Sequence, residues 1–347
     1  MPLFLGALVF ILLFQANEII FLYKEYPSAK VPPLALLKYV LYRSPYFVSQ
    51  ALPMSIALAA GLVGSRLARE SELTAMRSAG IPIRRVLFPV LIAGLLAATF
   101  DFFVVERLNP NSQLAARKLL GEVGMLNVNP SMATNKPIVL ANGTLVYIQA
   151  MVRRPKDELE LQGITLLERQ ADQLTITQAP QGTYRDGFWT LEDTFAVFLK
   201  GQNLLTTKSS GKTVINEKIE VEDLMLPPQA EEKSIQKLRE SITQAKRTSA
   251  PLEAIRGLEI NLWSRFSVPF ACLVFTLTST VISIFYARLG PSVGVIASLI
   301  LVMIWFNLYI ITTKILANTA AMPPFLAAFL PDIALVIFGF VMLRRVE

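Results

Sequence analysis

The chain has 347 residues, which is enough for one large domain or two domains of ordinary size. Hydrophobic residues make up 53% of it and charged residues only 17%. Soluble domains carry roughly 25% charge, so the composition indicates a membrane protein. The lack of histidine excludes histidine-based acid–base catalysis, histidine zinc sites and serine-type catalytic triads. The single cysteine, Cys272, excludes an intrachain disulfide or a thiolate metal cluster.

The net charge of +7 comes from the apolar parts of the chain. Residues 110–260 hold equal numbers of basic and acidic side chains, so the basic excess lies in the two flanking regions. This distribution favours contact with a membrane surface or an anionic lipid. It argues against binding to nucleic acid, because proteins that bind nucleic acid usually carry their basic charge on a polar domain.

Six segments are long and apolar enough to cross a membrane, which takes about 20 mostly apolar residues. Three precede residue 110 and three follow residue 260. The first does not resemble a signal peptide, because residues 1–6 contain no basic side chain and no A-x-A site follows; it is interpreted as a retained helix. The predicted spans are Leu3–Leu22, Tyr46–Ala68, Val86–Val105, Leu262–Tyr286, Val293–Leu316 and Phe325–Leu343.

Basic residues in the short loops predict a cytoplasmic N-terminus. With that orientation the inner ends of the spans hold eight arginines, as the positive-inside rule requires: Arg66, Arg69, Arg77, Arg84, Arg85, Arg288, Arg344 and Arg345. The segment between the two groups of spans then lies outside. Four basic residues in the first outer loop depart from the rule and therefore need a functional reason; they are Lys24, Lys30, Lys38 and Arg43.

The middle segment is typical of β-structure. Short apolar runs are separated by turn residues, and Asn142-Gly143 is a two-residue hairpin signal. The pattern predicts a sandwich or jelly roll. Residues 231–256 are polar, with apolar positions at helical spacing, and predict a helix that returns the chain to the membrane. The candidate strands are Ile138–Leu140, Leu145–Met151, Ile164–Glu168, Leu174–Thr177, Phe188–Leu191, Phe195–Leu199 and Val214–Val221.

The predicted fold class is therefore a multi-pass α-helical membrane protein with six transmembrane helices, three plus three, and an inserted periplasmic all-β domain of jelly-roll type. The predicted divisions are a first transmembrane half (1–109), the β-domain (110–230), a periplasmic connecting helix (231–261) and a second transmembrane half (262–347).

No motif for catalysis or nucleotide binding is present. Gly211-Lys212-Thr213 resembles the end of a phosphate-binding loop, but that loop needs a glycine where this chain has Thr206. A polar hairpin tip is the favoured interpretation. No acid–base pair, activated nucleophile or metal-ligand cluster is visible in the sequence, so we expect no catalytic residues, metal or cofactor.

The loop between the second and third spans predicts a short cytoplasmic helix at about residues 70–80. Acidic residues at its start and Arg77 in its last turn match the helix dipole, and Gly80 followed by Pro82 would end it. Leu73, Met76 and Ala79 give it one apolar edge. It could lie on the lipid surface or insert into a groove of a cytoplasmic partner. On the lipid surface, the two glutamates would face anionic lipid, which is unfavourable. Insertion into a groove of a partner is therefore the favoured interpretation.

Two segments resemble a known family. Residues 71–80, S-E-L-T-A-M-R-S-A-G, resemble the S-E-[LM]-T-x-[ML]-x-[AS]-x-G stretch of the lipopolysaccharide export permeases YjgP/YjgQ (LptF/LptG). Residues 263–272 resemble the R-x-x-x-P-[FL] start of that family's fourth helix, with Arg265 and Pro269 in the matching positions. The helix arrangement is similar too, so the resemblance covers nearly the whole chain. The family usually has a short cytoplasmic segment before the first helix, whereas this chain begins almost inside it.

The resemblance implies a permease subunit of an ATP-binding-cassette transporter in the cell inner membrane, with cytoplasmic N- and C-termini. Such permeases extract lipopolysaccharide and pass it to a periplasmic bridge. Implied partners are a cytoplasmic ATPase dimer, a second permease subunit or second copy, periplasmic jelly-roll bridge proteins and lipopolysaccharide, and ATP hydrolysis belongs to the partner. The expected ATPase-coupling residues are Glu70, Glu72, Leu73, Met76 and Arg77, and the expected lipid-binding residues are Lys24, Lys30, Lys38, Arg43, Arg265 and Lys314.

Ionisable residues inside the spans support a lipid pathway. Charges at membrane depth cost several kcal/mol unless they pair or line a hydrated cavity. Five are expected at a similar depth in the outer half, which favours a cavity open to the outside over separate salt bridges: Glu18, Asp101, Arg265, Lys314 and Asp332. Phe188, Trp189, Phe195, Val197 and Phe198 could line an acyl-chain trough or an ordinary sandwich core. A secondary transporter and a membrane scaffold protein for another anionic lipid remain alternatives.

Overall fold

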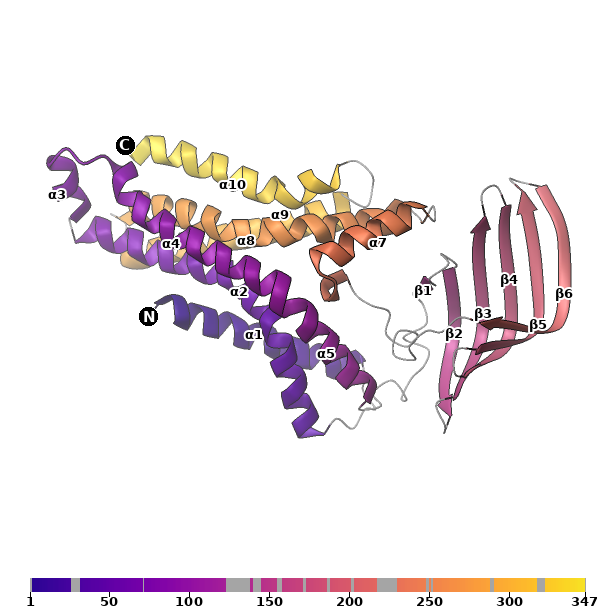
Figure 1. The fold of residues 1–347 in the computed structure, drawn as a ribbon. Helices are drawn as coiled ribbons and strands as arrows, with labels where there is room; N and C mark the ends of the chain where they lie inside the picture. Colours follow the sequence, from indigo (N-terminus) through magenta and orange to yellow (C-terminus); the bar gives the residue numbers. More distant parts are fainter. Residues whose placement is uncertain are drawn as a thin grey trace.

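The computed structural model describes residues 2–25, 32–70, 72–122, 138–139, 145–154, 158–170, 173–185, 188–200, 203–216, 230–247, 250, 252–287, 290–316 and 322–346. A bundle of long helices carries the short helix α3 (Glu72–Ser78) at one end and a β-sheet beyond the other (Figure 1). We call these ends of the bundle the α3 end and the sheet end.

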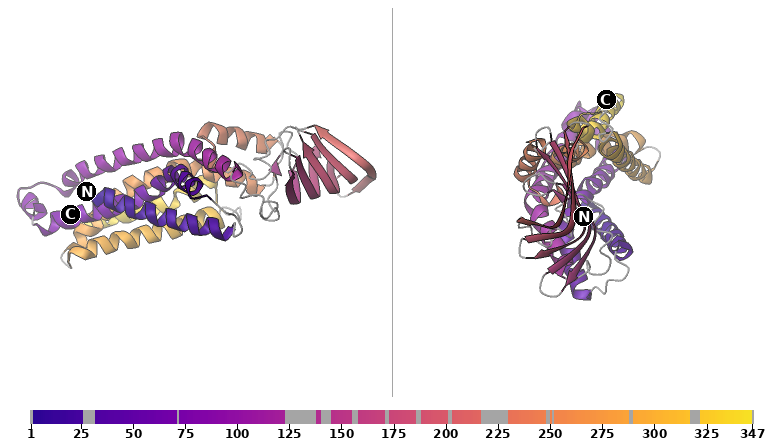
Figure 2. Two further views of the ribbon diagram at one scale, coloured as in Figure 1. Left: turned by 90° about the horizontal axis from the view of Figure 1, so that it is seen from below. Right: turned by 90° about the vertical axis from the view of Figure 1, so that its right-hand side faces the viewer.

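The prediction of six membrane-spanning helices is confirmed: six helices are long and apolar enough to cross a membrane. α1 begins and α10 ends towards the α3 end, opposite the sheet (Figure 2). Three spans are longer than hydropathy predicts, and the predicted domain boundary at residue 109 lies inside a continuous helix. The spans are α1 (Pro2–Glu25), α2 (Pro33–Arg69), α4 (Ile83–Phe103) running through a π-helical turn η1 (Val104–Leu108) into α5 (Asn109–Glu122), α8 (Leu252–Tyr286), α9 (Pro291–Ile310) with a second π-helical turn η6 (Ile311–Leu316), and α10 (Pro324–Val346).

The centre of the bundle is formed by α2 and α8. In the most apolar 18-residue stretch of each helix, 67% of the residues of α2 and 78% of those of α8 are buried. In the corresponding stretch of α1, none of the residues is buried. The main apolar cluster joins residues of α2, α3, α4, α8, α9 and α10. The two transmembrane halves are therefore packed around a shared central pair, one helix from each half.

Small residues allow the helices around α8 to approach it closely. A Cβ added to Gly64 would lie 2.6 Å from the Thr280 carbonyl oxygen of α8. A Cβ on Gly61 would overlap the hydroxyl of Ser298 on α9. These glycines lie on the edge of α2 that also carries buried Ala57 and Ser65, so the spacing of small residues reflects close helix packing.

We expect Gly64→Ala to lower the stability of the permease bundle markedly, because the methyl group would meet backbone atoms of α8 rather than a movable side-chain end. Gly257→Ala is the matched control: it also lies in a helix, but nothing stands within 4 Å of its added Cβ. The midpoint of thermal unfolding in detergent measures both. Equal midpoints for the two variants would contradict the close α2–α8 contact.

The inserted β-domain is confirmed, whereas a jelly roll is not. The described strands form one antiparallel sheet in chain order, each pairing with the next, without the crossovers that a jelly roll requires. The predicted turn at Asn142-Gly143 lies outside the described residues. The strands are the two-residue β1 (Ile138–Val139) and five long ones, β2 (Leu145–Arg154), β3 (Glu158–Gln170), β4 (Gln173–Arg185), β5 (Phe188–Lys200) and β6 (Asn203–Asn216).

A row of residues crosses the sheet where the strands bend, and we call it the kink row. By strand register it consists of residues opposite one another on β2 to β6. Two of them, Gly163 and Asp193, have positive φ values of 62° and 52°. The alternation of buried and exposed side chains shifts by one residue at this row. In β5, Trp189 and Leu191 are buried before Asp193, whereas Thr194 is buried after it. The row comprises Gln149, Gly163, Pro180, Asp193 and Gly211.

The kink row explains where strand prediction is wrong. The runs Phe188–Leu191 and Phe195–Leu199 are two halves of the single strand β5, because the alternation breaks at Asp193. Gly211-Lys212-Thr213 is not a hairpin tip but lies within β6. The predicted trough residues do not share a face: Trp189 is buried, whereas Phe188 and Phe195 are about half exposed.

The chain leaves the β-domain through η4 (Ala230–Glu232) and α7 (Ile235–Arg247), and then enters α8. The prediction of a polar helix with an apolar stripe is confirmed, since Leu238 and Ile242 of α7 are buried. The ion pair between Lys246 Nζ and Glu259 Oε1, 2.6 Å apart, joins α7 to α8. Residues 230–235, which bring the chain from the sheet side back to the bundle, are called the return segment below.

Candidate functional site

The short helix α3 is held at the end of the bundle by one apolar side chain. Leu73 is 6% exposed and belongs to the main apolar cluster, together with residues of α4, α8 and α10. Gly80 ends the helix with a φ of 81°, and the Ile81 amide donates to the Met76 carbonyl 2.9 Å away, as in a Schellman cap. The predicted glycine stop is therefore confirmed, although α3 has seven residues rather than about ten.

The exposed side of α3 carries Glu72, Thr74 and Ala75, with Met76 half-buried. Leu73, which the sequence suggests as an apolar contact for a partner, instead anchors the helix to its own chain. Glu70 does not begin α3; it follows the last residue of α2 and pairs with Arg66, Nε to Oε1, at 2.9 Å. The side chain of Arg77 lies outside the described residues.

At the sheet end, Arg43 joins three helices. Its guanidinium lies 2.8 Å from Glu18 Oε1 of α1, and it donates to the Gln113 side-chain oxygen of α5. Tyr39 donates to the same Glu18 oxygen at 2.8 Å. The Arg43 side chain is only 17% exposed. Lys38 and Arg43 lie on α2 and not in a loop, and the geometry gives Arg43 a structural role.

Arg265 is likewise buried among protein groups. It is 5% exposed and donates from Nη2 to the carbonyls of Glu231 and Lys233, at 2.9 and 2.8 Å, and more weakly to that of Ala230 at 3.3 Å. Its Nη1 donates to the carbonyl of Val105 in η1. These contacts leave no free face of the guanidinium for a lipid phosphate, so Arg265 connects α8, η1 and the return segment.

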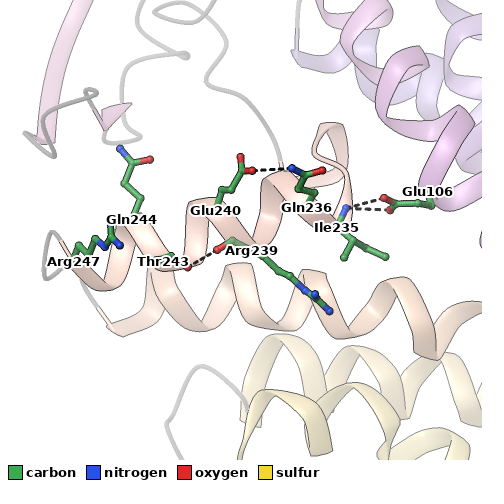
Figure 3. A pocket seen from close by; sticks show the side chains of 8 residues that line it. All are labelled: Glu106, Ile235, Gln236, Arg239, Glu240, Thr243, Gln244 and Arg247. Carbon is green, nitrogen blue, oxygen red and sulfur yellow. Dashed lines mark hydrogen bonds between the residues drawn. The ribbon is translucent and has the colours of Figure 1, made fainter.

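Two further contacts hold the return segment. Both carboxylate oxygens of Glu106 lie 3.1 Å from the Ile235 amide at the start of α7, as Figure 3 shows. Arg117 of α5 pairs with Glu232, Nε to Oε2, at 3.1 Å, and their side chains are 10% and 8% exposed. Neither pair was foreseen from the sequence, because the partners are more than a hundred positions apart.

Lys233 lies beside these contacts. Its amine donates to the Ser241 hydroxyl of α7 at 2.9 Å. Burial lowers the pKa of the Lys233 amine, an effect that the neighbouring Glu232 carboxylate opposes. The return segment is therefore fixed by charged groups that water reaches poorly.

An open groove of about 860 Å³ runs along the polar face of α7 (Figure 3). Its charged residues are Glu106, Arg239, Glu240 and Arg247. The two arginines and two glutamates balance, and Glu240 accepts a hydrogen bond from Gln236 at 3.2 Å. The groove is thus a polar surface next to the return segment, without a net charge of its own.

The five ionisable residues of the spans have different surroundings. Glu18 pairs with Arg43 and Arg265 with backbone carbonyls, while Lys314 is exposed. Asp332 is fully buried and accepts from the Trp305 indole at 2.8 Å. Asp101 is also fully buried, but its carboxyl, which faces Ser49, has no hydrogen bond of normal geometry. The surroundings of the five residues therefore differ, and the shared outward-facing cavity expected from the sequence stays a prediction.

The family model for the lipopolysaccharide export system permease LptF/LptG matches residues 1–345. The chain belongs to this family. No individual curated protein matches the sequence at a significant level.

Family membership establishes the class of activity. The chain is a multi-pass membrane permease of an ATP-binding-cassette system that extracts lipopolysaccharide from the inner membrane, and the ATPase of that system is a separate subunit. Among the residues that the structure describes, no group of three or more His, Cys, Asp or Glu side chains could hold a metal ion.

The predicted lipid-binding residues of this permease fall into distinct positions. Lys24 is exposed in the last turn of α1, and Lys38 is exposed near the start of α2. Lys314 is exposed in η6, and all three lie towards the sheet end. Lys30 lies outside the described residues. Arg43 and Arg265 are used within the fold, which leaves the exposed lysines as candidates for lipid contact.

Proposed function

We propose that this permease forms one half of the membrane part of a lipopolysaccharide exporter, with the α3 end in the cytoplasm and the sheet in the periplasm. The observation that supports this proposal best is α3, a helix anchored at the end of the bundle with Glu72, Thr74 and Ala75 exposed. The same end holds basic residues at the ends of α2, α4 and α10, which supports a cytoplasmic location; they are Arg66, Arg69, Arg84, Arg85, Arg344 and Arg345.

The cytoplasmic partner is proposed to be an ATP-binding-cassette ATPase dimer that contacts α3. Glu72 would pair with a basic residue in a groove of the ATPase, and Met76 would add an apolar contact. The burial of Leu73 supports a division of roles on this helix. Leu73 fixes α3 to the bundle, and the exposed residues around it meet the ATPase.

A second permease subunit, or a second copy of this chain, is proposed to complete the membrane part. No residue in the apolar stretch of α1 is fully buried by its own chain, although Phe10 and Phe14 pack against the main apolar cluster, so its outward side is left to face lipid or another subunit. The bridge is proposed to dock on the sheet. Among the described strands β6 pairs only with β5, and an edge strand can accept a strand from a jelly-roll partner.

The lipid is proposed to enter at the sheet end of the spans, where Lys24 contacts a phosphate of its headgroup. A charge-assisted hydrogen bond of this kind contributes about 1.5–3 kcal/mol. Lys24 is preferred over Lys38 because it directly follows the apolar stretch of α1, whereas Lys38 lies eight residues before Tyr46, where the apolar stretch of α2 is predicted to begin.

We expect Lys24→Glu to reduce lipopolysaccharide bound to the purified complex by roughly tenfold or more, the scale of one lost charge-assisted contact. Lys38→Glu is the matched control, since it makes the same charge change on an exposed helical lysine and should have a much smaller effect. Bound lipid is measured by mass spectrometry after purification in mild detergent. Equal, negligible losses in both variants would show that these lysines are ordinary surface charges.

The proposed function as a whole is tested by purifying the permease with its co-expressed partners. We expect an ATPase to co-purify and lipopolysaccharide to leave proteoliposomes only when ATP is hydrolysed. ATP-independent, ion-gradient-driven release would favour a secondary transporter instead. Absence of any bound ATPase from a folded preparation would contradict the proposed coupling through α3.

A further inference from the structure

Three segments that are distant in sequence meet at the sheet end of the bundle: the η1–α5 helix, the return segment with the start of α7, and α8. Arg265 of α8 binds the carbonyls of the return segment and of η1, Glu106 of η1 caps α7, and Arg117 of α5 pairs with Glu232. We call this set of contacts the junction. Through it, the segment that leaves the β-sheet is tied to two different spans, the α4–α5 helix and α8.

The π-helical turn η1 makes one of these contacts possible. In a regular α-helix the Asn109 amide would donate to the Val105 carbonyl, four residues earlier. Here the Asn109 amide donates to the Val104 carbonyl instead, which releases the Val105 carbonyl from the helix pattern. That carbonyl accepts from Arg265. Single π-helical turns within α-helices are frequent at functional sites, and this one is occupied by a charged group from another span.

The helix that carries Arg265 also reaches the α3 end. α8 is continuous over 35 residues, and its last two turns contribute Val281, Ile282 and Ile284 to the cluster in which Leu73 of α3 is buried. A movement imposed on α3 therefore acts on one end of α8. The junction contacts α8 in its other half, at Arg265, and interdigitated helices move as packed units rather than deforming continuously.

We propose that the junction transmits ATPase-driven movement of α3, along α8, to the β-sheet, so that the sheet is positioned to receive lipid when the bundle closes. This inference rests on the proposed function, because it assumes that α3 meets the ATPase. Arg117, Glu232 and Arg265 are positioning residues in this scheme. They act on the return segment and do not touch the lipid.

The Arg117–Glu232 pair offers the sharpest test, because reversing it leaves Arg265 in place. In complexes reconstituted in proteoliposomes, we expect Arg117→Glu to lower the amount of lipopolysaccharide transferred per ATP hydrolysed by roughly tenfold, the scale of breaking a largely buried ion pair. Glu232→Arg should do the same. The double variant Arg117→Glu/Glu232→Arg restores an opposite-charge pair and should recover transfer per ATP to within roughly threefold of the original.

A control variant and two contrary outcomes distinguish a role of the Arg117–Glu232 pair in coupling from a purely structural role. Lys246→Glu reverses a charge in the α7–α8 ion pair outside the junction and should leave transfer per ATP unchanged. If ATP hydrolysis and transfer fall together in Arg117→Glu, the pair is only structural and the inference is wrong. It is also wrong if the double variant gives no recovery. Lack of ATP-driven transfer by the unsubstituted complex would instead contradict the proposed function itself.

Discussion

Leu73→Ala should release the ATPase from the complex while the six spans stay folded. α3 has only seven residues, too few for a helix to be stable on its own in water, so its position depends on the burial of Leu73. Truncating a buried leucine to alanine costs about 2–5 kcal/mol. The loss should therefore fall on the docking of α3 rather than on the bundle, whose core contains many other side chains.

The measurement is the ratio of ATPase to permease after purification, together with ATP-dependent export. Thr74→Ala, an exposed position on the same helix, is the control and should retain both. Glu72→Ala should weaken the complex as well, by about 2–5 kcal/mol if its carboxylate pairs within the ATPase groove. Full ATPase recruitment and export in Leu73→Ala would show that α3 holds its place without this anchor.

Asp332→Leu should lower stability more than Asp101→Leu, although both carboxyls are fully buried. Asp332 accepts from the Trp305 indole and lies 2.9 Å from the Ser267 hydroxyl, so its removal leaves a buried donor unpaired at a cost of about 1–3 kcal/mol. Asp101 faces Ser49 without a hydrogen bond of normal geometry. Burying a poorly paired polar group is unfavourable, and replacing Asp101 should therefore cost less stability than replacing Asp332.

Thermal unfolding in detergent measures both effects. Asp332→Asn keeps an acceptor for the indole and is the control for size; it should lie close to the unsubstituted protein. A loss of stability in Asp101→Leu as large as that in Asp332→Leu would show that Asp101 makes a contact of its own. An export defect in an Asp101→Leu variant that unfolds at the same temperature as the unsubstituted protein would show that this carboxyl is needed for function.

The spans could be predicted because apolar length is a property of a local segment. Their full extents could not, since the first part of α2 carries Lys38 and Arg43, and no average of hydropathy reveals that Arg43 pairs with Glu18 and donates a hydrogen bond to Gln113. The role of Arg265 could not be predicted for the same reason. A basic residue near the outer surface resembles a lipid contact until the structure places four backbone carbonyls around it.

The strands illustrate a different limit. Alternation of apolar and polar residues identifies a strand only while the strand keeps one face towards the core. β5 changes its buried face at Asp193, so its sequence resembles two short strands. In contrast, the end of α3 was predictable from Gly80, because a glycine with positive φ is a local requirement of the cap. The sequence identifies its anchor, Leu73, as apolar. It does not show whether Leu73 contacts a partner protein or the helices of its own chain.

The central pairing of α2 with α8 has a consequence for biosynthesis. Every pairing among the described strands joins neighbours in the chain, so the β-domain can form from local contacts as soon as it has been synthesised. The α2–α8 contact joins residues more than two hundred positions apart, such as Gly64 and Thr280. During synthesis α2 is therefore inserted long before its main partner exists, and its close-packing glycines face lipid or another protein meanwhile. Completion of the bundle is a late event, governed by the emergence of α8 from the ribosome rather than by the insertion of the first three spans.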